Sequence, residues 1–317
     1  MSEQRPLVPP LLAGLCDDAA LFPPGNAPVA AAVPAHRGHR AAWYADLVGP
    51  FLLGADRIAE VGDAAAGEPL DVVLVVRAGP AALAEALDRL AARPALRLLG
   101  VELGPDADGT PADAAARCRD ALARELPPGA AGVVELRRPA DGDSARGRAA
   151  LEAALDLLAA AGLRAKYRTG GLEPQAFPSA AELAALVGGC AARALPFKCT
   201  AGLHHAVRHT DPATGFTHHG FLNILAATDA ALRGAAGGDV AEVLECRQGG
   251  ELAAALADAP AAPGADTRAD ALRAVFTAYG TCSVTEPLAD LAALGLLTRP
   301  DADLPADPTH PDTLDRA

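Results

Sequence analysis

Lysine is almost missing from this sequence. Of the 27 basic residues, 25 are arginine, and Lys166 and Lys198 are the two lysines. The chain therefore uses arginine wherever positive charge is needed only for solubility, so we expect the two lysines to have a chemical purpose. A desolvated lysine can lose its proton and attack a carbonyl group to form a Schiff base, which arginine cannot do.

Long apolar segments and disulfide patterns are also missing. The longest apolar runs, such as residues 151–163, are interrupted before the roughly 20 residues that a membrane-spanning helix needs. The first residues lack a basic region followed by an apolar one, so we expect no signal peptide, no membrane partner and a cytoplasmic location. The six cysteines include no Cys-x-x-Cys pair, which predicts reduced thiols.

Aromatic residues and excess positive charge are scarce as well. Aromatic residues make up 3% of the chain, and 27 basic against 40 acidic residues give a net charge of −13. No segment combines clustered arginine with interleaved aromatics, so we expect no nucleic-acid partner. Hydrophobic residues make up 51% of the chain, which predicts a folded, soluble protein. Its predicted alanine-rich helices are compatible both with a monomer and with a homo-oligomer.

Short apolar runs alternate with longer stretches of helical periodicity, which predicts repeated βα units and a parallel sheet. At 317 residues the chain fits one single-domain (β/α)8 TIM barrel, here assigned to residues 1–298, followed by an acidic tail over residues 299–317. The eight predicted strands are Leu11–Cys16, Phe51–Leu53, Asp71–Val76, Leu96–Leu103, Gly132–Leu136, Leu163–Tyr167, Pro196–Thr200 and Val275–Thr281.

Several helix boundaries carry their own signals. Residues 81–92 are amphipathic, and capping patterns open helices at Thr110-Pro-Ala-Asp and at Ser179-Ala-Ala-Glu. Residues 239–258 are predicted as helix before a linker at 259–266. A last short helix is expected from Thr285, as its cap, to the stop at Gly295.

The two lysines fall at equivalent places in this predicted barrel. Lys166 and Lys198 stand at the carboxyl ends of the sixth and seventh predicted strands, on the face where barrel enzymes place their active sites. Two neighbouring ammonium groups would lower each other's pKa, so that one of them becomes a nucleophile. Ion pairing or simple anion binding is the alternative role for both lysines.

The segments around the lysines resemble a known pair of motifs. Lys166-Tyr-Arg-Thr-Gly-Gly and Phe197-Lys-Cys-Thr-Ala-Gly-Leu are similar to the paired motifs of deoxyribose-phosphate aldolase and related class I aldolase barrels. This resemblance implies that Lys166 forms the Schiff base and that Lys198 tunes it. Tyr279-Gly-Thr-Cys-Ser is similar to the Gly-x-Ser-Ser end of that family's eighth strand. The match covers residues 163–203 and 276–283.

The chain departs from this family after the strand-seven lysine, and its acid on the fourth strand matches by position alone. Ala201-Gly-Leu-His-His replaces the Gly-Gly-hydrophobic-Arg segment that helps the family to hold phosphate, so a phosphorylated substrate is optional. Glu102 corresponds to the acid on the family's fourth strand by strand order alone. The chain also resembles bacterial barrels that have no established reaction.

Five of the eight histidines lie between residues 204 and 219, in the loop after the seventh predicted strand, and Asp211 lies among them. Such a density of imidazoles suits a transition-metal site or a proton shuttle. The alternative is a polar loop that hydrogen bonds order, since no recognised metal-ligand spacing is present. His204 and His205 are candidates for general acid or base.

Charged residues at other strand ends predict a polar pocket, because barrel interiors are normally filled with branched apolar side chains. Each of them could instead form a structural ion pair. Arg77, Arg137 and Arg168 together indicate an anionic substrate, either carboxylate or phosphate. Residues 18–25 resemble a rim loop, and Asn223 either faces the mouth or caps a helix. The charged positions are Asp17, Asp18, Arg77, Glu102, Glu135, Arg137 and Arg168.

These observations support three hypotheses about function. The first is a lyase of the class I aldolase type that acts through a Schiff base on a small anionic carbonyl compound and needs no cofactor. The second is a metal-dependent hydrolase or isomerase that uses the loop of His204 to His219, and the third is a non-catalytic barrel that binds a small anion. The candidate catalytic residues are Lys166, Lys198, Glu102, Glu135, His204 and His205. The candidate substrate-binding residues are Asp18, Arg77, Arg137, Arg168, Thr169, Gly170, Thr200, Gly202, His219, Asn223 and Ser283.

Overall fold

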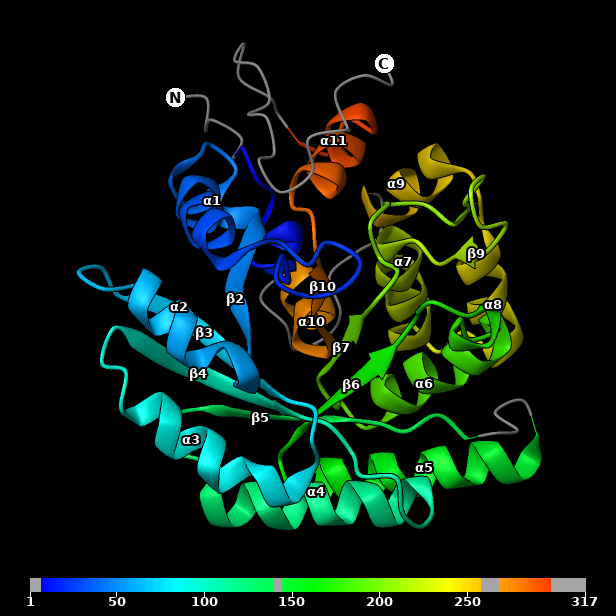
Figure 1. Cartoon of the computed structure of the whole chain (residues 1–317). Helices are drawn as coiled ribbons and strands as arrows, with labels where there is room; N and C mark the ends of the chain where they lie inside the picture. The colour runs from blue at the N-terminus through cyan, green and yellow to red at the C-terminus, as the bar shows by residue number, and fades with distance from the viewer. Residues whose placement is uncertain (1–6, 140–143, 258–267, 298–317) are drawn as a thin grey trace.

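The computed structural model describes residues 7–139, 144–257 and 268–297 and shows a closed barrel of eight parallel strands (Figure 1). Strand β10 pairs with both β7 and β1 and thereby closes the barrel, with Tyr279 opposite Cys16. This confirms the predicted (β/α)8 fold. The strands follow one another as β1 (Cys16–Asp18), β2 (Val48–Gly54), β3 (Leu70–Val76), β4 (Leu96–Leu103), β5 (Ala131–Glu135), β6 (Arg164–Arg168), β7 (Phe197–Thr200) and β10 (Phe276–Thr281).

Helices surround the strands on the outside (Figure 1). They are α1 (Val29–Ala41), α2 (Ile58–Ala64), α3 (Leu83–Ala91), α4 (Pro111–Glu125), α5 (Ala145–Ala160), α6 (Ala180–Ala192), α7 (Phe221–Leu232), α8 (Gly237–Glu245), α9 (Gly249–Ala257), α10 (Arg268–Val275) and α11 (Thr285–Ala293). Single 3₁₀ turns lie at Pro10–Leu12, Ala45–Leu47, Ala55–Arg57, Pro80–Ala82 and Pro174–Ala176. Among the described residues, no helix combines the length and the apolar character that crossing a membrane would require.

The hydrophobic core lies between the strands and this outer layer of helices. Leu53 on β2 and Leu74 on β3 are completely buried, as is Leu83 at the start of α3. Phe221 of α7 stacks on Tyr279 of β10 with ring centroids 4.8 Å apart. Burial of these apolar side chains drives the helices onto the sheet, which leaves the polar residues at the strand ends to form the site. All six cysteines are free, as predicted.

The first strand lies further along the chain than its sequence predicts. Residues 10–12 form a 3₁₀ turn with Pro10 at its first position, and β1 begins at Cys16. Proline has no N–H to donate to a sheet, which explains why the apolar run of Leu11 and Leu12 does not extend the strand. Asp17 and Asp18 therefore belong to the strand itself and do not follow it. β4 has the predicted bounds, and the remaining strands differ by a few residues.

Two predicted helices near the carboxyl end of the chain differ in detail from the observed ones. The described part of the predicted helix 239–258 is helical, but as two helices, α8 and α9, that are separated by residues 246–248. Thr285 is not the cap of α11; it is the first residue of that helix, and the Ser283 hydroxyl accepts from the backbone N–H of Glu286. Gly295, with φ of 68°, ends the helix as expected. The predicted linker at 259–266 and tail at 299–317 lie outside the described residues.

The loop after β7 contains a hairpin that the sequence does not predict. Strands β8 (His209–Thr210) and β9 (Thr217–His218) pair antiparallel, and their turn is closed by Asp211, whose carboxylate accepts from the Thr214 hydroxyl. Two-residue strands are too short to leave a periodic pattern in a sequence. The hairpin positions the histidines beside the barrel mouth.

The cap of α4 gives a direct test of this local structure. The Thr110 hydroxyl accepts from the Asp113 N–H, and the Asp113 carboxylate accepts from the Thr110 N–H at 2.9 Å, which is a complete capping box. Thr110→Ala removes the hydroxyl and should lower the free energy of unfolding by about 1 kcal/mol in urea titrations. Thr110→Ser keeps the hydroxyl and should stay close to the parent protein. Equal losses for the two variants would contradict the assignment.

Candidate active site

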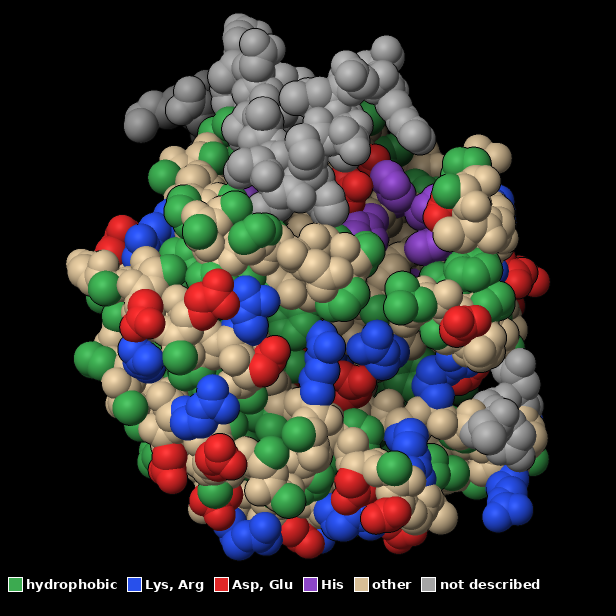
Figure 2. All heavy atoms as spheres, viewed as in Figure 1, with side chains coloured by type: hydrophobic (Ala, Val, Ile, Leu, Met, Phe, Trp, Pro, Cys, Tyr) green, Lys and Arg blue, Asp and Glu red, His purple; other side chains and the backbone are tan. Residues whose placement is uncertain are grey.

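A cavity of about 100 Å³ opens at the carboxyl end of the barrel. The ends of β4, β6, β7 and β10 form its floor and walls, and the loop after β1 covers one side. Figure 2 shows basic side chains in the middle of the visible face and histidines gathered to one side, near α7 and β9. We call this cavity the C-terminal pocket; it is lined by Ala19, Phe22, Pro23, Leu52, Val75, Arg77, Glu102, Lys166, Arg168, Thr200, Ala201, Gly202, His204, Gly280 and Cys282.

Glu102 joins the two lysines at the floor of the barrel. Lys166 Nζ lies 2.6 Å from one carboxylate oxygen of Glu102, and Lys198 contacts the other oxygen. The pairing of β6 with β7 sets Lys166 directly opposite Lys198, so one inward carboxylate on β4 can reach both amines. All three side chains are at least 94% buried. The two lysines thus share one carboxylate.

Three more charged groups extend this arrangement at its ends. Lys198 also contacts Asp17 of β1, and Lys166 Nζ lies 3.0 Å from Glu135 Oε2 of β5. Arg168 of β6 lies 3.8 Å from the other oxygen of Glu135. Positive and negative groups therefore alternate across the barrel. We call this series the charge chain; it runs Asp17, Lys198, Glu102, Lys166, Glu135, Arg168.

The charge chain sets the protonation states at its centre. Burial alone would raise the pKa of Glu102, but the positive charges and hydrogen bonds of Lys166 and Lys198 lower it to about 2. Burial would likewise lower the pKa of Lys198, and the carboxylates of Asp17 and Glu102 raise it above its ordinary value. The pKa of Asp17 is raised because its burial outweighs the attraction of Lys198. Glu102 and Lys198 therefore stay charged at neutral pH.

The two lysines face different cavities. Lys166 lines the C-terminal pocket, whereas Lys198 lines a second cavity of about 250 Å³ at the opposite end of the barrel, where the strands begin. Glu102 borders both cavities and separates the two amines. The expectation that the lysines lower each other's pKa is wrong for Lys198, because each of its neighbours in the charge chain is a carboxylate. The second cavity is lined by Gly14, Asp17, Pro50, Val73, Leu99, Gly100, Glu102, Ala131, Val133, Arg164, Lys198, Thr277 and Ala278.

Four of the residues predicted to bind substrate line the C-terminal pocket, namely Arg77, Arg168, Thr200 and Gly202. The guanidinium of Arg77 lies over the ring of Phe22, 4.7 Å from its centroid, so the rim loop helps to orient this arginine. The Arg168 side chain is 45% exposed and reaches the mouth. Two guanidinium groups at one opening favour an anionic ligand.

Other predicted substrate-binding residues support the walls of the pocket from outside it. The Thr169 hydroxyl donates to the backbone carbonyl of Ala201 at 2.8 Å, which ties the turn after β6 to the turn after β7. Gly170 and Gly202 pack against each other, because a Cβ at Gly170 would lie 3.0 Å from the Gly202 Cα. Ser283 belongs to the turn before α11.

The structure places the remaining candidates away from the pocket lining. The carboxylate of Asp18 contacts His36 at 2.9 Å, and Arg137 donates to the carbonyl of Ala107 at 2.6 Å, outside the barrel mouth. Asn223 is fully buried, accepts from the Arg208 N–H and donates to two carbonyls at the end of α8, those of Val243 and Cys246. These three side chains connect structural elements to one another. Their polar groups were visible in the sequence, but their partners lie far along the chain.

His219 is also a structural residue. Its Nδ1 accepts from Arg208 at 3.0 Å, and its Nε2 donates to the Pro178 carbonyl at 2.8 Å. Burial lowers the pKa of His219 to about 4, so it is neutral at physiological pH. The hydrogen bond from His219 to the Pro178 carbonyl joins the histidine loop to the segment before α6.

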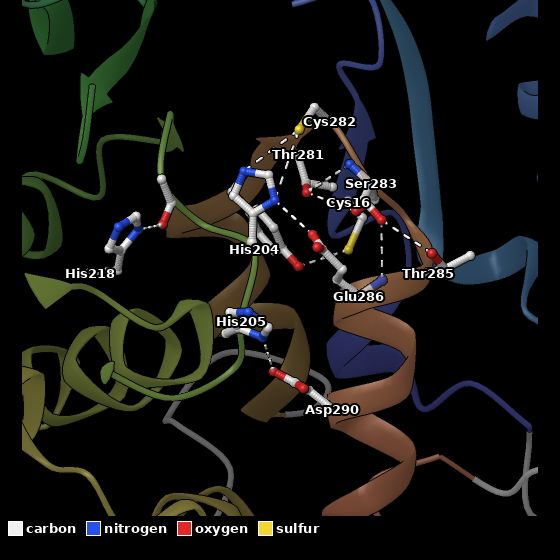
Figure 3. Close-up of polar contacts among 12 residues, drawn as sticks. Cys16, His204, His205, His218, Thr281, Cys282, Ser283, Thr285, Glu286 and Asp290 are labelled. Atoms are coloured by element: carbon white, nitrogen blue, oxygen red, sulfur yellow. Dashed lines mark hydrogen bonds and ion pairs between the residues drawn. The ribbon is translucent and has the colours of Figure 1, made fainter. Parts of the chain in front are cut away.

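The histidines of the loop pair with carboxylates of α11. His204 Nδ1 lies 2.7 Å from Glu286, and His205 Nδ1 lies 3.2 Å from Asp290, one turn further along the helix (Figure 3). His204 lines the C-terminal pocket and His205 does not. His209 stacks on His218, with ring centroids 5.2 Å apart. Across the residues that the structure describes, no three His, Cys, Asp or Glu side chains are grouped to hold a metal ion.

His204 also contacts a thiol that is not among the predicted site residues. Cys282 Sγ lies 3.6 Å from His204 Nε2 and 3.9 Å from Nδ1. Burial works against the imidazolium, but hydrogen bonds with Cys282 and Glu286 raise the pKa of His204 to about 10. The sequence offered one signal for this contact, the cysteine next to Ser283 in the motif that ends the eighth strand.

A scan of family models found none that matches this chain, and a search among curated proteins found no relative. The assignment of function therefore depends on the geometry of the pocket.

The shared carboxylate can be tested through stability. Glu102→Gln leaves two buried ammonium groups with one negative charge fewer, and the free energy of unfolding in urea at neutral pH should fall by about 3 kcal/mol. Glu85→Gln, on the exposed face of α3, is the matched control and should change it by less than about 0.5 kcal/mol. A Glu102→Gln protein that unfolds at the same urea concentration as the parent would show that the charge chain does not hold the barrel together.

The raised pKa of His204 predicts how stability depends on pH. A group whose folded pKa exceeds its unfolded value of 6.5 stabilises the fold fully below that value and loses this effect as pH rises to about 10. The difference in unfolding free energy between the parent and His204→Asn should shrink across this range, by up to about 1.4 kcal/mol for each pH unit. Glu286→Gln should remove part of the same dependence. A difference that grows with pH would have the wrong sign.

Proposed function

We propose that this protein is a lyase of the class I aldolase type, in which Lys166 forms a Schiff base with a small anionic carbonyl compound. One observation carries the proposal. Of the two lysines in the chain, Lys166 is the one that lines the C-terminal pocket, and it does so from a buried position between two carboxylates. A buried amine that lines a pocket beside a carboxylate able to take its proton suits imine chemistry.

In this proposal the two carboxylates beside Lys166 have different roles. Glu102 stays ionised because its pKa is about 2, so it is a poor acceptor for a proton and serves to position Lys166. Glu135 lies 3.0 Å from the same amine and is less buried, and we assign the proton transfers to it. Removal of the ammonium proton by Glu135 frees the lone pair of Lys166 for attack on the carbonyl carbon.

The reaction then follows from the iminium group. The new C–N bond forms, the carbonyl oxygen accepts protons and leaves as water, and the positively charged iminium withdraws electrons from the neighbouring carbon. This withdrawal allows the adjacent C–C bond to break or to form. Arg77 and Arg168 at the mouth supply positive charge for a carboxylate or phosphate on the substrate.

Lys198 has a different part in this proposal from the one that the family resemblance implies. It borders the other cavity and stays protonated, so it acts on Lys166 through Glu102 and is not itself among the residues that line the C-terminal pocket. By holding one oxygen of Glu102, it leaves the other oxygen facing Lys166. Lys198 is thus a positioning residue.

Neither of the two alternative functions is supported by an observation of the same kind. A metal-dependent hydrolase would need the imidazoles of the histidine loop to converge on one point, but His204 and His205 contact separate carboxylates of α11. A barrel that only binds an anion would use Arg77 and Arg168 in the same way but would leave Lys166 chemically unmodified. Formation of a covalent adduct on Lys166 separates the anion-binding barrel from the lyase.

Trapping with borohydride tests the Schiff base. Incubation with small aldehydes and keto acids, followed by borohydride, should add the mass of the reduced substrate to the peptide that contains Lys166. Lys198 and the N-terminal amine report non-specific imine formation within the same sample. Lys166→Arg keeps the positive charge but cannot form the imine, and its adduct should disappear. Absence of any Lys166 adduct across a broad panel of carbonyl compounds would refute the proposal.

A further inference from the structure

Three side chains form a line at one wall of the C-terminal pocket. Glu286 contacts His204 Nδ1 at 2.7 Å, and the ring of His204 in turn lies 3.6 Å from the sulfur of Cys282 through Nε2 (Figure 3). Cys282 and His204 both line the pocket. A nucleophile beside a base that a third group orients is the arrangement of catalytic triads, in which a cysteine can take the place of serine.

The local fold holds these groups in place. Cys282 directly follows β10, and the Thr281 hydroxyl donates to the Ser283 carbonyl at 2.8 Å in the turn after it. The Ser283 hydroxyl accepts from the Glu286 N–H, which sets Glu286 in the first turn of α11. His204 approaches from the loop after β7, and its Nδ1 is fixed by Glu286 (Figure 3). Nε2 is then the ring nitrogen nearest the sulfur.

Gly25 of the rim loop leaves room for the thiol of Cys282. A Cβ on Gly25 would lie 2.9 Å from Cys282 Cβ and 3.3 Å from its sulfur, so a side chain there would displace Cys282. Cys282 is 4% exposed and lies in the pocket wall that Arg77 and Lys166 also border. The thiol therefore faces a small polar cavity.

We infer that Cys282, His204 and Glu286 form a second nucleophilic centre on the C-terminal pocket, which binds a small aldehyde as a thiohemiacetal. The sulfur forms a bond with the carbonyl carbon while the carbonyl π electrons move to oxygen. His204 gives its proton to that oxygen, and the Cys282 proton replaces it on the imidazole. One thiol and one aldehyde give one thiohemiacetal, and reversal releases the aldehyde, so no other reactant is needed.

The charges around the thiol favour this reactivity. Glu286 on α11 favours the imidazolium form of His204, which faces Cys282; His205 and His218 in the same loop act against that form. A neighbouring imidazolium stabilises a thiolate. Burial instead raises the pKa of Cys16 and of Cys118 to about 12, and their thiols donate to the Tyr279 hydroxyl and to the Gly104 carbonyl. Cys246 is partly exposed beside Glu251 and serves as the thiol for comparison.

This inference is independent of the imine at Lys166. It involves the wall made by β10, α11 and the histidine loop, whereas the imine involves the floor made by β4, β5 and β6. A failed test of one centre therefore leaves the other standing.

Alkylation kinetics provide the test. Folded protein is treated with iodoacetamide at about pH 6, and peptide mass spectrometry measures the rate at each of the six cysteines. Cys282 should react at least about tenfold faster than Cys246, because its thiolate persists at a pH where an ordinary thiol is protonated. His204→Asn should remove this advantage, and Glu286→Gln should reduce it. Gly25→Ala should also slow the reaction by displacing the sulfur.

The aldehyde is then tested by protection in the Lys166→Arg variant, in which no imine can form at that position. Acetaldehyde and the anionic aldehyde glyoxylate should each slow alkylation of Cys282 in a saturable way, without slowing that of Cys246, and dialysis should restore the rate. Equal rates at Cys282 and Cys246, or an unchanged Cys282 rate in His204→Asn, would overturn the nucleophilic centre. A fast Cys282 that neither aldehyde protects would overturn the choice of ligand.

Discussion

The carboxylate of Glu102 stands between two buried ammonium groups, and the rest of the pocket depends on that contact. Charges inside a protein destabilise it unless they are paired and hydrogen-bonded. Glu102 pairs with both lysines, one through each oxygen, and Asp17 and Glu135 complete the compensation at either end. Removing any central member of the charge chain would leave an unpaired charge in the core, so these residues form a single unit.

This constraint also distinguishes the two amines chemically. Lys198 is enclosed by Asp17 and Glu102, both of which raise its pKa, and its cavity lies at the end of the barrel where the strands begin. Lys166 occupies the same level on the next strand but borders the pocket where barrel enzymes work. Its second partner, Glu135, belongs to the strand on its other side, so a proton can leave Lys166 without disturbing Lys198. The proposed division of roles follows from which cavity each lysine borders.

The sequence predicted what local periodicity and residue type can express. Apolar runs that alternate with helical stretches identified the barrel, and the scarcity of lysine singled out Lys166 and Lys198. The sequence named Glu102 by strand order alone and could not show that its carboxylate lies between the lysines, because Glu102 is 64 residues from Lys166 and the contact depends on how β4 faces β6 across the barrel. Glu286 was missed for the same reason, being 82 residues from His204. The histidine cluster suggested a metal because composition shows that imidazoles are numerous but does not show which carboxylates they contact.

Helix α11 contributes more to the pocket than its position at the end of the barrel suggests. In a closed barrel the eighth strand lies between the first and the seventh, so the helix after it begins beside the loop that follows β7. Glu286 and Asp290 are four residues apart and therefore lie on the same face of α11, where they contact His204 and His205. That pairing orients His204 towards Cys282 and draws His205 away from the pocket. The loop thereby supplies one imidazole to the wall of the pocket, and the closure of the barrel determines which one.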